Sequence, residues 1–515
     1  MPGRRGRDNG AGVWDQAGSG ARVAVIGGGV AGLASALAFA RLGAQVTVFE
    51  RDEMPLPPTP LEAFRSWRRR GAPQVWHSHA FLGRLGKLLR ERLPDLHAEL
   101  LRHGAEEIAL ADLDLSGLVD FEPEPGDREL VLLACRRITF EWVLRRLVER
   151  EPGVRFRSGV RVVGLSGTRA PGSPPEVRGV RLRSRSGGEE LTADFVVDAS
   201  GRRSALSRWL GELGAEAPAV RRSPCGIFYT SRFYRLRAGR PTPPARGPIG
   251  VDLGYLKYGL FPGDSGVFSL TFAADPADAP LRALYREGPF AAAAAAIPDL
   301  APWVDAARSE AITPVRVMAG LANARRRFLR EGEPVALRVF AVGDAAIHTN
   351  PLYGRGCTLA FVHAFLLADA FGTHREDPAE LARAFDEATR REVLPWYRAA
   401  VASDEDAREV ADLIRRGVDP AAGPPPDGAV DPRRFVRSVL RDGLGPALRR
   451  DGVVLRAFLR TFHLLGPPEA LFTDPEVVRR VTAVWQQRRS DPGPGPDPER
   501  GPSRSELVAR LREAA

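Results

Sequence analysis

Apolar and polar positions at the start of the chain follow the order strand, glycine turn, helix, strand. The apolar run 23–26 leads into Gly27, Gly29 and Gly32, a helical stretch follows, and the next apolar strand ends in Glu50. This order predicts a βαβ unit. In such units the glycines allow a tight turn, the approach of a pyrophosphate and close packing of the helix on its strand. We therefore expect a dinucleotide at the helix N-terminus, with its ribose hydroxyls on Glu50.

The acid at the end of this unit narrows the choice of dinucleotide. A carboxylate accepts hydrogen bonds from a ribose 2′-OH and repels a 2′-phosphate, so Glu50 favours FAD or NAD over NADP. Three neighbours of the turn and of the acid are expected to share in the site: Val30, Ala31 and Arg51.

The pattern changes near residue 222, where longer strand-like runs rich in aromatic residues begin. Residues 262–266 supply the turn of a predicted hairpin. We interpret this part as an antiparallel β-sheet inserted into an α/β, Rossmann-like domain, so that the chain is α+β overall. The predicted divisions are a flexible tail (1–20), a nucleotide-binding domain in two parts (21–221 and 316–375), the inserted substrate domain (222–315), a helical C-terminal region (376–487) and a mostly disordered tail (488–515).

A second glycine loop follows an apolar strand far downstream. Asp344 ends that strand, where a carboxylate can accept a hydrogen bond from a sugar hydroxyl, and Pro351 turns the chain. Gly354 and Gly356 then allow the backbone to approach a planar ligand. A helix is expected to begin near Thr358, with its positive dipole end facing the loop. Such a helix would stabilise negative charge on a reduced flavin ring.

These motifs resemble those of the FAD-dependent monooxygenase superfamily, which has a glutathione-reductase-like fold. The similarity is greatest to the squalene-epoxidase-like and polyether-epoxidase-like branch, to which geranylgeranyl reductases and flavin-dependent halogenases are related. The resemblance implies that the dinucleotide is FAD. It also implies cofactor contacts at both glycine loops, at a middle motif and at an arginine near the flavin: Gly27, Gly29, Gly32, Glu50, Arg137, Asp198, Gly201, Gly343, Asp344, Pro351, Gly354, Arg355, Gly356 and Cys357.

Some of these assignments have alternatives. Arg137 lies four residues before Glu141 on a predicted helix, where it would otherwise be a surface arginine. Cys357 would otherwise be a small buried hydrophobe beside the loop. The middle motif reads Asp-Ala-Ser-Gly where many aromatic hydroxylases have an adjacent Asp-Gly, which weakens any inference about the pyridine nucleotide.

The resemblance implies an FAD-dependent monooxygenase, an epoxidase or hydroxylase of an apolar small molecule such as a specialised metabolite. NADH or NADPH would be the reductant, O2 the co-substrate and a flavin hydroperoxide the oxidant. Because the cofactor carries this chemistry, we assign no catalytic residue. The alternatives are an FAD-dependent reductase or dehydrogenase of an isoprenoid-like double bond, a flavin-dependent halogenase, and a flavin-binding partner without turnover. The Trp-x-Trp motif of the halogenases is absent from the sequence.

Candidate substrate contacts lie in two places. His79 shares a face with His77, but no third ligand accompanies them, so we expect hydrogen bonding at the substrate-side wall and no metal. In the inserted sheet only one face of each strand packs on a core, and aromatic side chains on the other face would line a cavity over the flavin. Core and cavity wall are alternatives for each of these residues: Tyr229, Tyr255, Tyr258 and Phe261.

Composition argues against several other classes of protein. The net charge is +10, but the basic residues are spread along the chain, so we expect no nucleic-acid partner. The cysteines are odd in number and far apart, at Cys135, Cys225 and Cys357, which argues against disulfides and fits a cytoplasmic protein. We expect no transmembrane segment, and we leave peripheral membrane contact and the oligomeric state open.

Overall fold

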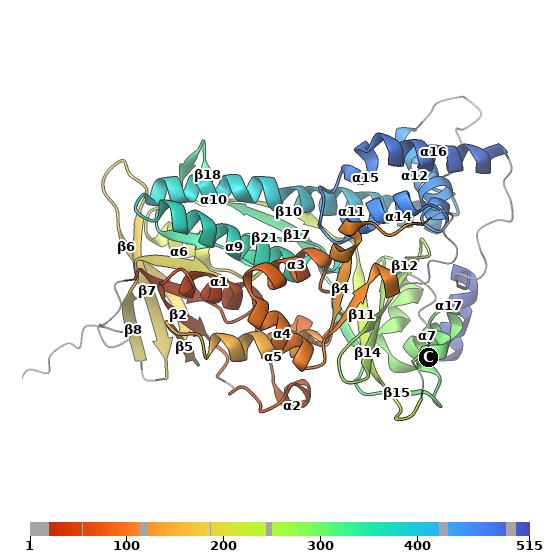
Figure 1. Cartoon of the computed structure of the whole chain (residues 1–515), viewed down its shortest axis with the longest axis horizontal. Helices are drawn as coiled ribbons and strands as arrows, with labels where there is room; N and C mark the ends of the chain where they lie inside the picture. The colour runs from red at the N-terminus through yellow and green to blue at the C-terminus, as the bar shows by residue number, and fades with distance from the viewer. Residues whose placement is uncertain are drawn as a thin grey trace, which may run out of the picture.

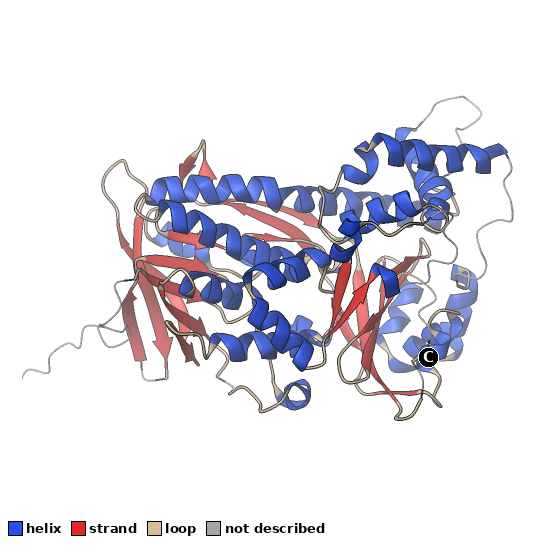
Figure 2. Ribbon diagram, viewed as in Figure 1, coloured by secondary structure: helices blue, strands red, loops and turns tan. Residues whose placement is uncertain are grey.

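The structure, a computed structural model, describes residues 20–515 except 54, 113–120, 186, 241, 244–249, 422–430 and 491–500. Its central element is a five-stranded parallel sheet in the order β20-β9-β1-β2-β5 (Figures 1 and 2). The inner strands are almost wholly apolar because both of their faces are buried. The five strands are β1 (Arg22–Ile26), β2 (Gln45–Glu50), β5 (Val154–Ser158), β9 (Phe195–Asp198) and β20 (Val339–Ala341).

One face of this sheet packs on a layer of helices. The layer contains α1 (Val30–Ala40), α5 (Arg137–Val148), α9 (Gly356–His374) and α10 (Pro378–Glu392). Within the described residues, α9 is the one helix long and apolar enough to cross a membrane, and 72% of its apolar window is buried inside the protein. Its packing in the core accounts for its apolar sequence.

The other face packs on the antiparallel sheet β6-β7-β8. These strands are β6 (Arg161–Thr168), β7 (Glu176–Ser184) and β8 (Gly187–Thr192). Smaller elements surround the two layers: α2 (Pro60–Ser66), α3 (Gly83–Arg92), α4 (Pro94–Arg102), α6 (Leu206–Glu212), β3 (Glu106–Ala109), β4 (Val131–Ala134), β10 (Ala219–Pro224), β17 (Ala322–Arg327), β18 (Leu329–Arg330), β19 (Glu333–Pro334) and β21 (Ile347–His348).

The inserted domain contains a six-stranded sheet in the order β12-β13-β14-β11-β15, with β16 also paired to β11. The predicted hairpin is confirmed, since β13 and β14 pair in antiparallel register around 262–267. Residues alternate between two faces, one on a separate core closed by helices and one toward the nucleotide-binding domain. The elements are β11 (Phe228–Leu236), β12 (Gly250–Asp252), β13 (Lys257–Pro262), β14 (Val267–Ala274), α7 (Glu287–Ala296), α8 (Ala301–Val304), β15 (Ser309–Ala311) and β16 (Arg316–Met318).

The C-terminal tail differs from the mostly disordered segment predicted at 488–515. α16 (Pro475–Ser490) reaches into that segment, and α17 (Arg504–Glu513) forms a further helix beyond residues 491–500, which lie outside the described residues. α17 lies beside α7 (Figure 1) and buries Leu507 and Leu511 in the core of the inserted domain. The prediction of disorder is therefore wrong for α17, because its apolar face completes that core.

The helical C-terminal region begins with α11 (Leu394–Arg415), the long helix that follows α10 (Figure 1). A group of shorter helices comes after it: α12 (Pro432–Val439), α13 (Gly445–Ala447), α14 (Gly452–Phe462), α15 (Ala470–Thr473) and α16. α12 buries a charged residue and exposes apolar ones. Arg437 is buried and donates to Asp406, whereas Phe435 and Val436 are about half exposed. α11 thus connects these helices to the nucleotide-binding domain.

Candidate functional site

The first glycine turn joins β1 to α1. Gly27 has a φ of 106°, in the left-handed region that favours glycine. A Cβ on Gly32 would lie 1.9 Å from the Gly27 carbonyl oxygen, so a side chain cannot fit there. At Gly29, by contrast, a Cβ would meet no atom within 4 Å, and no side chain caps the N-terminus of α1. Open space and uncapped N–H groups together form a site of the kind that holds a pyrophosphate.

Glu50 lies beside this turn at the end of β2. It is 7% exposed, and its Oε2 accepts a hydrogen bond from the Gly28 N–H at 3.1 Å. A guanidinium that sequence reasoning missed contacts the same carboxylate: Arg69 Nη1 lies 3.3 Å from Glu50 Oε2. Arg69 Nη2 also donates to the Gly28 carbonyl at 2.8 Å. Arg69 therefore ties the acid to the backbone of the turn.

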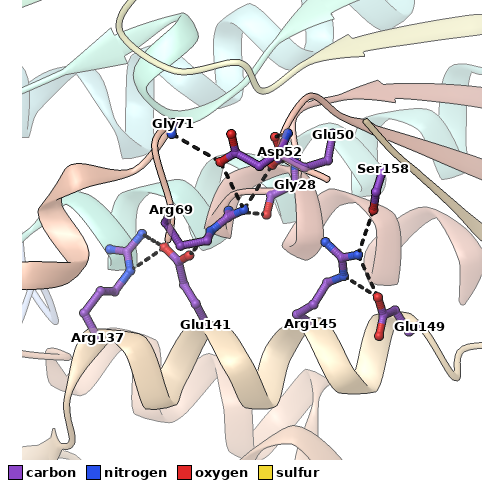
Figure 3. A network of polar contacts seen from close by, with 10 residues as sticks. All are labelled: Gly28, Glu50, Asp52, Arg69, Gly71, Arg137, Glu141, Arg145, Glu149 and Ser158. Atoms are coloured by element: carbon purple, nitrogen blue, oxygen red, sulfur yellow. Dashed lines mark hydrogen bonds and ion pairs between the residues drawn. The ribbon is translucent and has the colours of Figure 1, made fainter. Parts of the chain in front are cut away.

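From Arg69 a series of alternating charges leads away from the turn (Figure 3). Arg69 Nε lies 3.2 Å from Glu141 Oε2, and Arg137 donates two hydrogen bonds to Glu141 Oε1, at 2.6 and 2.8 Å. Arg137 Nη1 then donates to Cys357 Sγ at 2.6 Å, at the start of α9. We call Glu50, Arg69, Glu141 and Arg137 the ion chain. It runs from the first glycine loop to the second.

The ion chain is buried and balanced in charge. Glu141 has no exposed surface, and although burial by itself raises the pKa of a carboxyl, Arg137 and Arg69 lower the pKa of Glu141 below its ordinary value. Glu50 and Glu141 face the two guanidiniums, and Asp52 Oδ2 lies 4.0 Å from Arg69 Nη1 as a further carboxylate at the end near the first turn. Opposite charges thus compensate each other, which is the condition under which buried ions are tolerated. The alternative of a surface position for Arg137 is wrong, because Arg137 is 6% exposed.

The neighbours of the first turn differ in their surroundings. Ala31 faces the second loop, since a Cβ on Gly343 would lie 2.8 Å from the Ala31 Cβ. Val30 is buried in the helix layer. Arg51 is exposed, with its guanidinium next to Gly71. The guanidinium on the Glu50 carboxylate is that of Arg69, although Arg51 is closer in sequence.

The middle motif follows β9. Asp198 is fully buried, its Oδ1 accepts from the Ser200 N–H at 2.9 Å, and its Oδ2 accepts from the Ser204 hydroxyl. Burial raises the pKa of Asp198. Gly201 has a φ of 81° and open space where a Cβ would point. The carboxylate therefore shapes this turn, and the accessible part of the motif is the backbone at Gly201.

The second glycine loop connects β20 to α9. Gly343 has a φ of 58°, and its N–H donates to His363 Nδ1 at 3.2 Å. Asp344, Gly343 and Gly356 border a small cavity at the start of α9. Gly354 has a φ of 67°, and a Cβ on Gly356 would meet open space. Three features thus meet around this cavity. The Asp344 carboxylate can accept from a hydroxyl, the glycines leave the backbone free of side chains, and the N-terminus of α9 is the positive end of its helix dipole.

The middle of this loop is a short 3-10 turn, η6 (Pro351–Tyr353), which Asn350 caps with its side-chain oxygen. Arg355 follows, and its guanidinium lies between two aromatic rings, 4.9 Å from the centroid of Tyr353 and 4.8 Å from that of Trp396. Burial lowers the pKa of Arg355 to about 10, which leaves it charged at neutral pH. The loop thus presents a cation held on aromatic faces.

A second small cavity lies between the ion chain and the inserted sheet, with His79, Cys135, Arg137 and Phe261 in its wall. His79 Nε2 lies 3.3 Å from Arg137 Nη1, and His79 Nδ1 lies 3.0 Å from the His77 carbonyl. Burial and the charge of Arg137 lower the pKa of His79 to about 3. His79 is therefore neutral at physiological pH. Through Arg137 this cavity adjoins the second glycine loop.

A row of hydroxyl groups, absent from the sequence predictions, follows the same wall. Ser231 Oγ lies 3.0 Å from His77 Nδ1 and 2.7 Å from Thr271 Oγ1. Thr271 donates to Ser78 at 2.7 Å, and Ser78 donates to Ser269 at 2.8 Å. We call Ser78, Ser231, Ser269 and Thr271 the hydroxyl row. The face of the inserted sheet toward the nucleotide-binding domain is therefore polar at its centre.

The four aromatic candidates separate onto two faces of the inserted sheet. Phe261 borders the second cavity, and Tyr229 lies edge-on to the ring of His77, 4.8 Å between centroids. The hydroxyls of Tyr255 and Tyr258 bond elsewhere, to the Pro502 carbonyl at 2.6 Å and to the Asp299 carboxylate at 3.0 Å. Assigning Tyr255 and Tyr258 to the cavity wall is wrong, because both pack with the separate core of the inserted domain.

The arrangement fits FAD on observations of the chain itself. Glu50 and the open N-terminus of α1 suit the adenosine ribose and the pyrophosphate, and Asp344 and the N-terminus of α9 suit the ribityl chain and the ring. Among the described residues, no group of three or more His, Cys, Asp or Glu side chains is placed to hold a metal ion.

Comparisons with known proteins agree with this geometry. A family model for pyridine nucleotide-disulphide oxidoreductases matches residues 22–69, which span the first glycine turn, Glu50 and Arg69. Protein Rv3254 of Mycobacterium tuberculosis is 27% identical over 491 residues, covering 88% of this chain and 91% of that protein. Kynurenine 3-monooxygenase of Salinispora arenicola is 27% identical over 403 residues, covering 75% of this chain and 80% of that protein.

Solved structures share the fold over most of the chain. PqsL, a probable FAD-dependent monooxygenase from Pseudomonas aeruginosa, superposes with a TM-score of 0.55 at 19% identity, covering 78% of this chain and 99% of its own. The similar structures also include FAD-dependent halogenases, such as the myxobacterial enzyme CndH, with a TM-score of 0.52 at 18% identity and 96% of each chain covered. The chain has the fold of the FAD-dependent monooxygenase superfamily.

Proposed function

We propose that this protein is an FAD-dependent monooxygenase that hydroxylates or epoxidises a small organic molecule, with NADH or NADPH as reductant and O2 as co-substrate. One observation supports this most directly. The cavity bordered by His79, Arg137 and Phe261 lies between the inserted sheet and the loop that would hold the flavin ring. This cavity has room for about one water molecule, so a substrate would have to widen it, and there it would meet the reactive end of the cofactor. The similarity to kynurenine 3-monooxygenase points to the same reaction class.

The wall of this cavity bears on the substrate. Phe261, Phe233 and Val267 supply apolar surface, whereas His79 and Ser269 supply hydrogen-bonding groups. Ser269 accepts a hydrogen bond from Ser78 in the hydroxyl row, so its own O–H can donate to a substrate, and a wholly apolar substrate would give that donor no acceptor. We therefore favour a substrate with an apolar ring or chain and at least one hydrogen-bonding group. A narrower form of this proposal is that the protein epoxidises this substrate rather than hydroxylating it, as in the squalene-epoxidase-like branch.

The chain's own residues bind, orient and exclude water. The bound flavin supplies the redox chemistry. Glu50 and the α1 N-terminus anchor its nucleotide end, while the uncapped start of α9 favours negative charge at its ring end. Arg137 keeps a positive charge beside Cys357, and neutral His79 accepts a hydrogen bond from Arg137 at the cavity. The packed inserted sheet keeps water from the space between them.

The decisive experiment uses the purified, FAD-loaded full chain. Candidate substrates are screened for acceleration of NADH or NADPH oxidation, and products formed under 18O2 are analysed by mass spectrometry. The proposal expects one 18O atom in each product molecule and no turnover without O2. Product formed anaerobically with a reduced double bond would establish the reductase alternative instead. A halogenated product that requires chloride or bromide would establish the halogenase alternative.

The halogenase alternative has the structural similarity to CndH in its favour. Against it, flavin-dependent halogenases use a dedicated lysine, and Lys87 of α3 forms an ion pair with Glu129, with Nζ 2.8 Å from Oε1; neither residue lines the cavity. A cytoplasmic location and contact with a membrane surface stay predictions.

A further inference from the structure

A buried carboxylate outside the ion chain holds the second glycine loop. Asp404, on α11, is 2% exposed. Its Oδ1 accepts hydrogen bonds from Asn350 Nδ2 and from the Tyr353 hydroxyl, both at 2.8 Å, and its Oδ2 accepts from Asn323 Nδ2 at 2.7 Å. Three donors from two segments, the second glycine loop and β17, thus converge on one side chain. Two of them belong to the loop that faces the proposed flavin ring.

Asn350 links this carboxylate to the shape of the loop. Its Nδ2 donates to Asp404, while its Oδ1 accepts from the Leu352 N–H at 3.0 Å and caps η6. Its own N–H donates to Asn323 Oδ1 at 2.7 Å. The amide of Asn350 can therefore adopt only one orientation. If it flipped, the cap would be lost and its oxygen would face the carboxylate.

The site requires a carboxylate rather than an amide. An asparagine at 404 would place its NH2 group against a donor, whichever way it turned. The facing amide of Asn323 cannot flip in response, because its oxygen is already bonded to the Asn350 N–H. The thiol of Cys225 also faces Asp404, and burial together with this carboxylate raises the pKa of Cys225 to about 12. The three groups that donate hydrogen bonds to the Asp404 carboxylate are thus neutral, and the charged guanidinium of Arg355 lies within electrostatic reach of it.

The same face of α11 holds the next part of the loop. Trp396, Ala400 and Asp404 recur every four residues and are all buried, so they share one side of the helix. Trp396 stacks on the guanidinium of Arg355, and Asp404 holds Tyr353. α11 therefore contacts the loop at two points before the chain enters α9.

We propose that Asp404 is a positioning residue for the flavin ring. It sets the conformation of residues 350–356 through Asn350 and Tyr353, and so couples the helical C-terminal region to the reactive end of the cofactor. The inference rests on FAD binding by the loop, as in the proposed function, but not on the reaction that follows. It can therefore stand if oxygenation is disproved.

The test compares FAD binding by three variants of the full chain. Asp404→Asn keeps the size of the side chain and removes its charge. Tyr353→Phe removes one hydrogen bond at a half-buried position, so this variant should keep the fold. It keeps the proposal testable in case Asp404→Asn does not fold. Asp406→Asn is the control, because Asp406 lies on the same helix but pairs with Arg437 of α12. The measurements are the FAD dissociation constant by flavin fluorescence, the visible circular dichroism of bound flavin, and the melting temperature of each apoprotein.

The expected result is FAD binding about tenfold weaker or more in Asp404→Asn, because at least one hydrogen bond to a charged acceptor is lost. Tyr353→Phe should bind FAD about three- to tenfold more weakly, with a wild-type apoprotein melting temperature. Both should change the visible circular dichroism of bound flavin, and Asp406→Asn should not. Wild-type FAD affinity and an unchanged flavin spectrum in Tyr353→Phe and in folded Asp404→Asn would overturn the proposal. If Asp404→Asn does not fold, wild-type FAD affinity and an unchanged flavin spectrum in Tyr353→Phe alone would overturn the proposal.

Discussion

The two glycine loops would hold opposite ends of one cofactor, yet they are supported in different ways. The first is held within its own βαβ unit, where Gly32 packs on the turn and Glu50 accepts from its backbone. The second is held from outside. His363 of α9 bonds to Gly343, and Asp404 of α11 bonds to the residues around η6. The first loop therefore rests mainly on contacts within its own unit, with Arg69 as a contact from outside it, whereas the second depends on the helices packed around it.

This difference assigns binding of the cofactor's nucleotide to the first loop and the reaction at the flavin ring to the second. In the proposed binding mode, the self-supporting loop would face the nucleotide end of FAD, which is the same in every flavoprotein that uses it. The externally supported loop would face the ring, where the substrate and the reaction are chosen. The ion chain joins the two loops, because its ends contact Gly28 and Cys357. Substitutions in the two loops should therefore have separable effects on cofactor binding and on protein stability.

The largest effect is expected from Gly29→Val. The Cβ position at Gly29 is open, and its φ of −86° suits any residue, so the apoprotein should fold and melt as the wild type does. The valine methyl groups would fill the space for a pyrophosphate at the α1 N-terminus. FAD affinity should fall at least about a thousandfold, or about 4 kcal/mol. Flavin fluorescence titration and absorbance of the purified protein would measure this loss.

Gly32→Ala is the matched comparison within the same loop. Its Cβ would lie 1.9 Å from the Gly27 carbonyl oxygen, so this variant should lose stability in the apoprotein itself. Differential scanning fluorimetry distinguishes the two outcomes. If Gly29→Val retained bound flavin, the pyrophosphate would have to lie elsewhere and the roles given to the two loops would be wrong.

The self-supporting loop could be predicted from sequence because its determinants lie close together. Gly27, Gly32 and Glu50 fall within one motif, and their geometry follows from glycine's freedom and strand order. The hairpin of the inserted sheet was predictable for the same reason. α17 also had a local signal, since Ser503 and Glu506 form a capping box, but the Pro- and Arg-rich composition around it masked this pattern.

The externally supported parts could not be predicted in this way. Arg69 lies in a loop, and its partner Glu141 is 72 residues away, so only the tertiary fold brings them together. The spacing of Arg137 and Glu141 by four residues did indicate one ion pair of the chain. Asp404 lies in no recognisable sequence motif, although the buried residues of α11 recur at helical spacing. For the hydroxyl row, strand alternation alone does not indicate which face meets the nucleotide-binding domain.

A smaller effect, on stability, is expected from Glu141→Gln. The substitution leaves the buried guanidiniums of Arg69 and Arg137 without their shared carboxylate. Breaking such a buried pair should lower the free energy of unfolding of the apoprotein by about 3 kcal/mol. Glu212→Gln is the control, because Glu212 and its partner Arg181 have side chains that are 42% and 46% exposed, and such a surface pair should contribute less than about 1 kcal/mol. Urea unfolding of both variants would measure the difference.

The stability that Glu141 contributes should depend on pH in a definite direction. The pKa of Glu141 is lowered in the folded protein from an ordinary value of 4.5. The unfolded chain therefore binds a proton first as the pH falls, so the stability from Glu141 is complete above pH 4.5 and is lost as the pH falls through the folded pKa. The stability difference between wild type and Glu141→Gln should shrink below pH 4.5. A difference that stayed constant into this range would show that folding does not lower the pKa of Glu141.

The smallest effect is expected from Trp396→Phe, which weakens the support of the second loop without removing it. Phenylalanine keeps an aromatic face for Arg355 but is a poorer partner for a cation than tryptophan, and Tyr353 still covers the other side of the guanidinium. FAD binding should weaken about two- to fivefold, corresponding to about 0.5–1 kcal/mol. Trp303→Phe, in the separate core of the inserted domain, is the control and should leave the FAD affinity unchanged. A loss in Trp396→Phe as large as that in Gly29→Val would mean that the second loop, and not the first, provides most of the affinity for the cofactor.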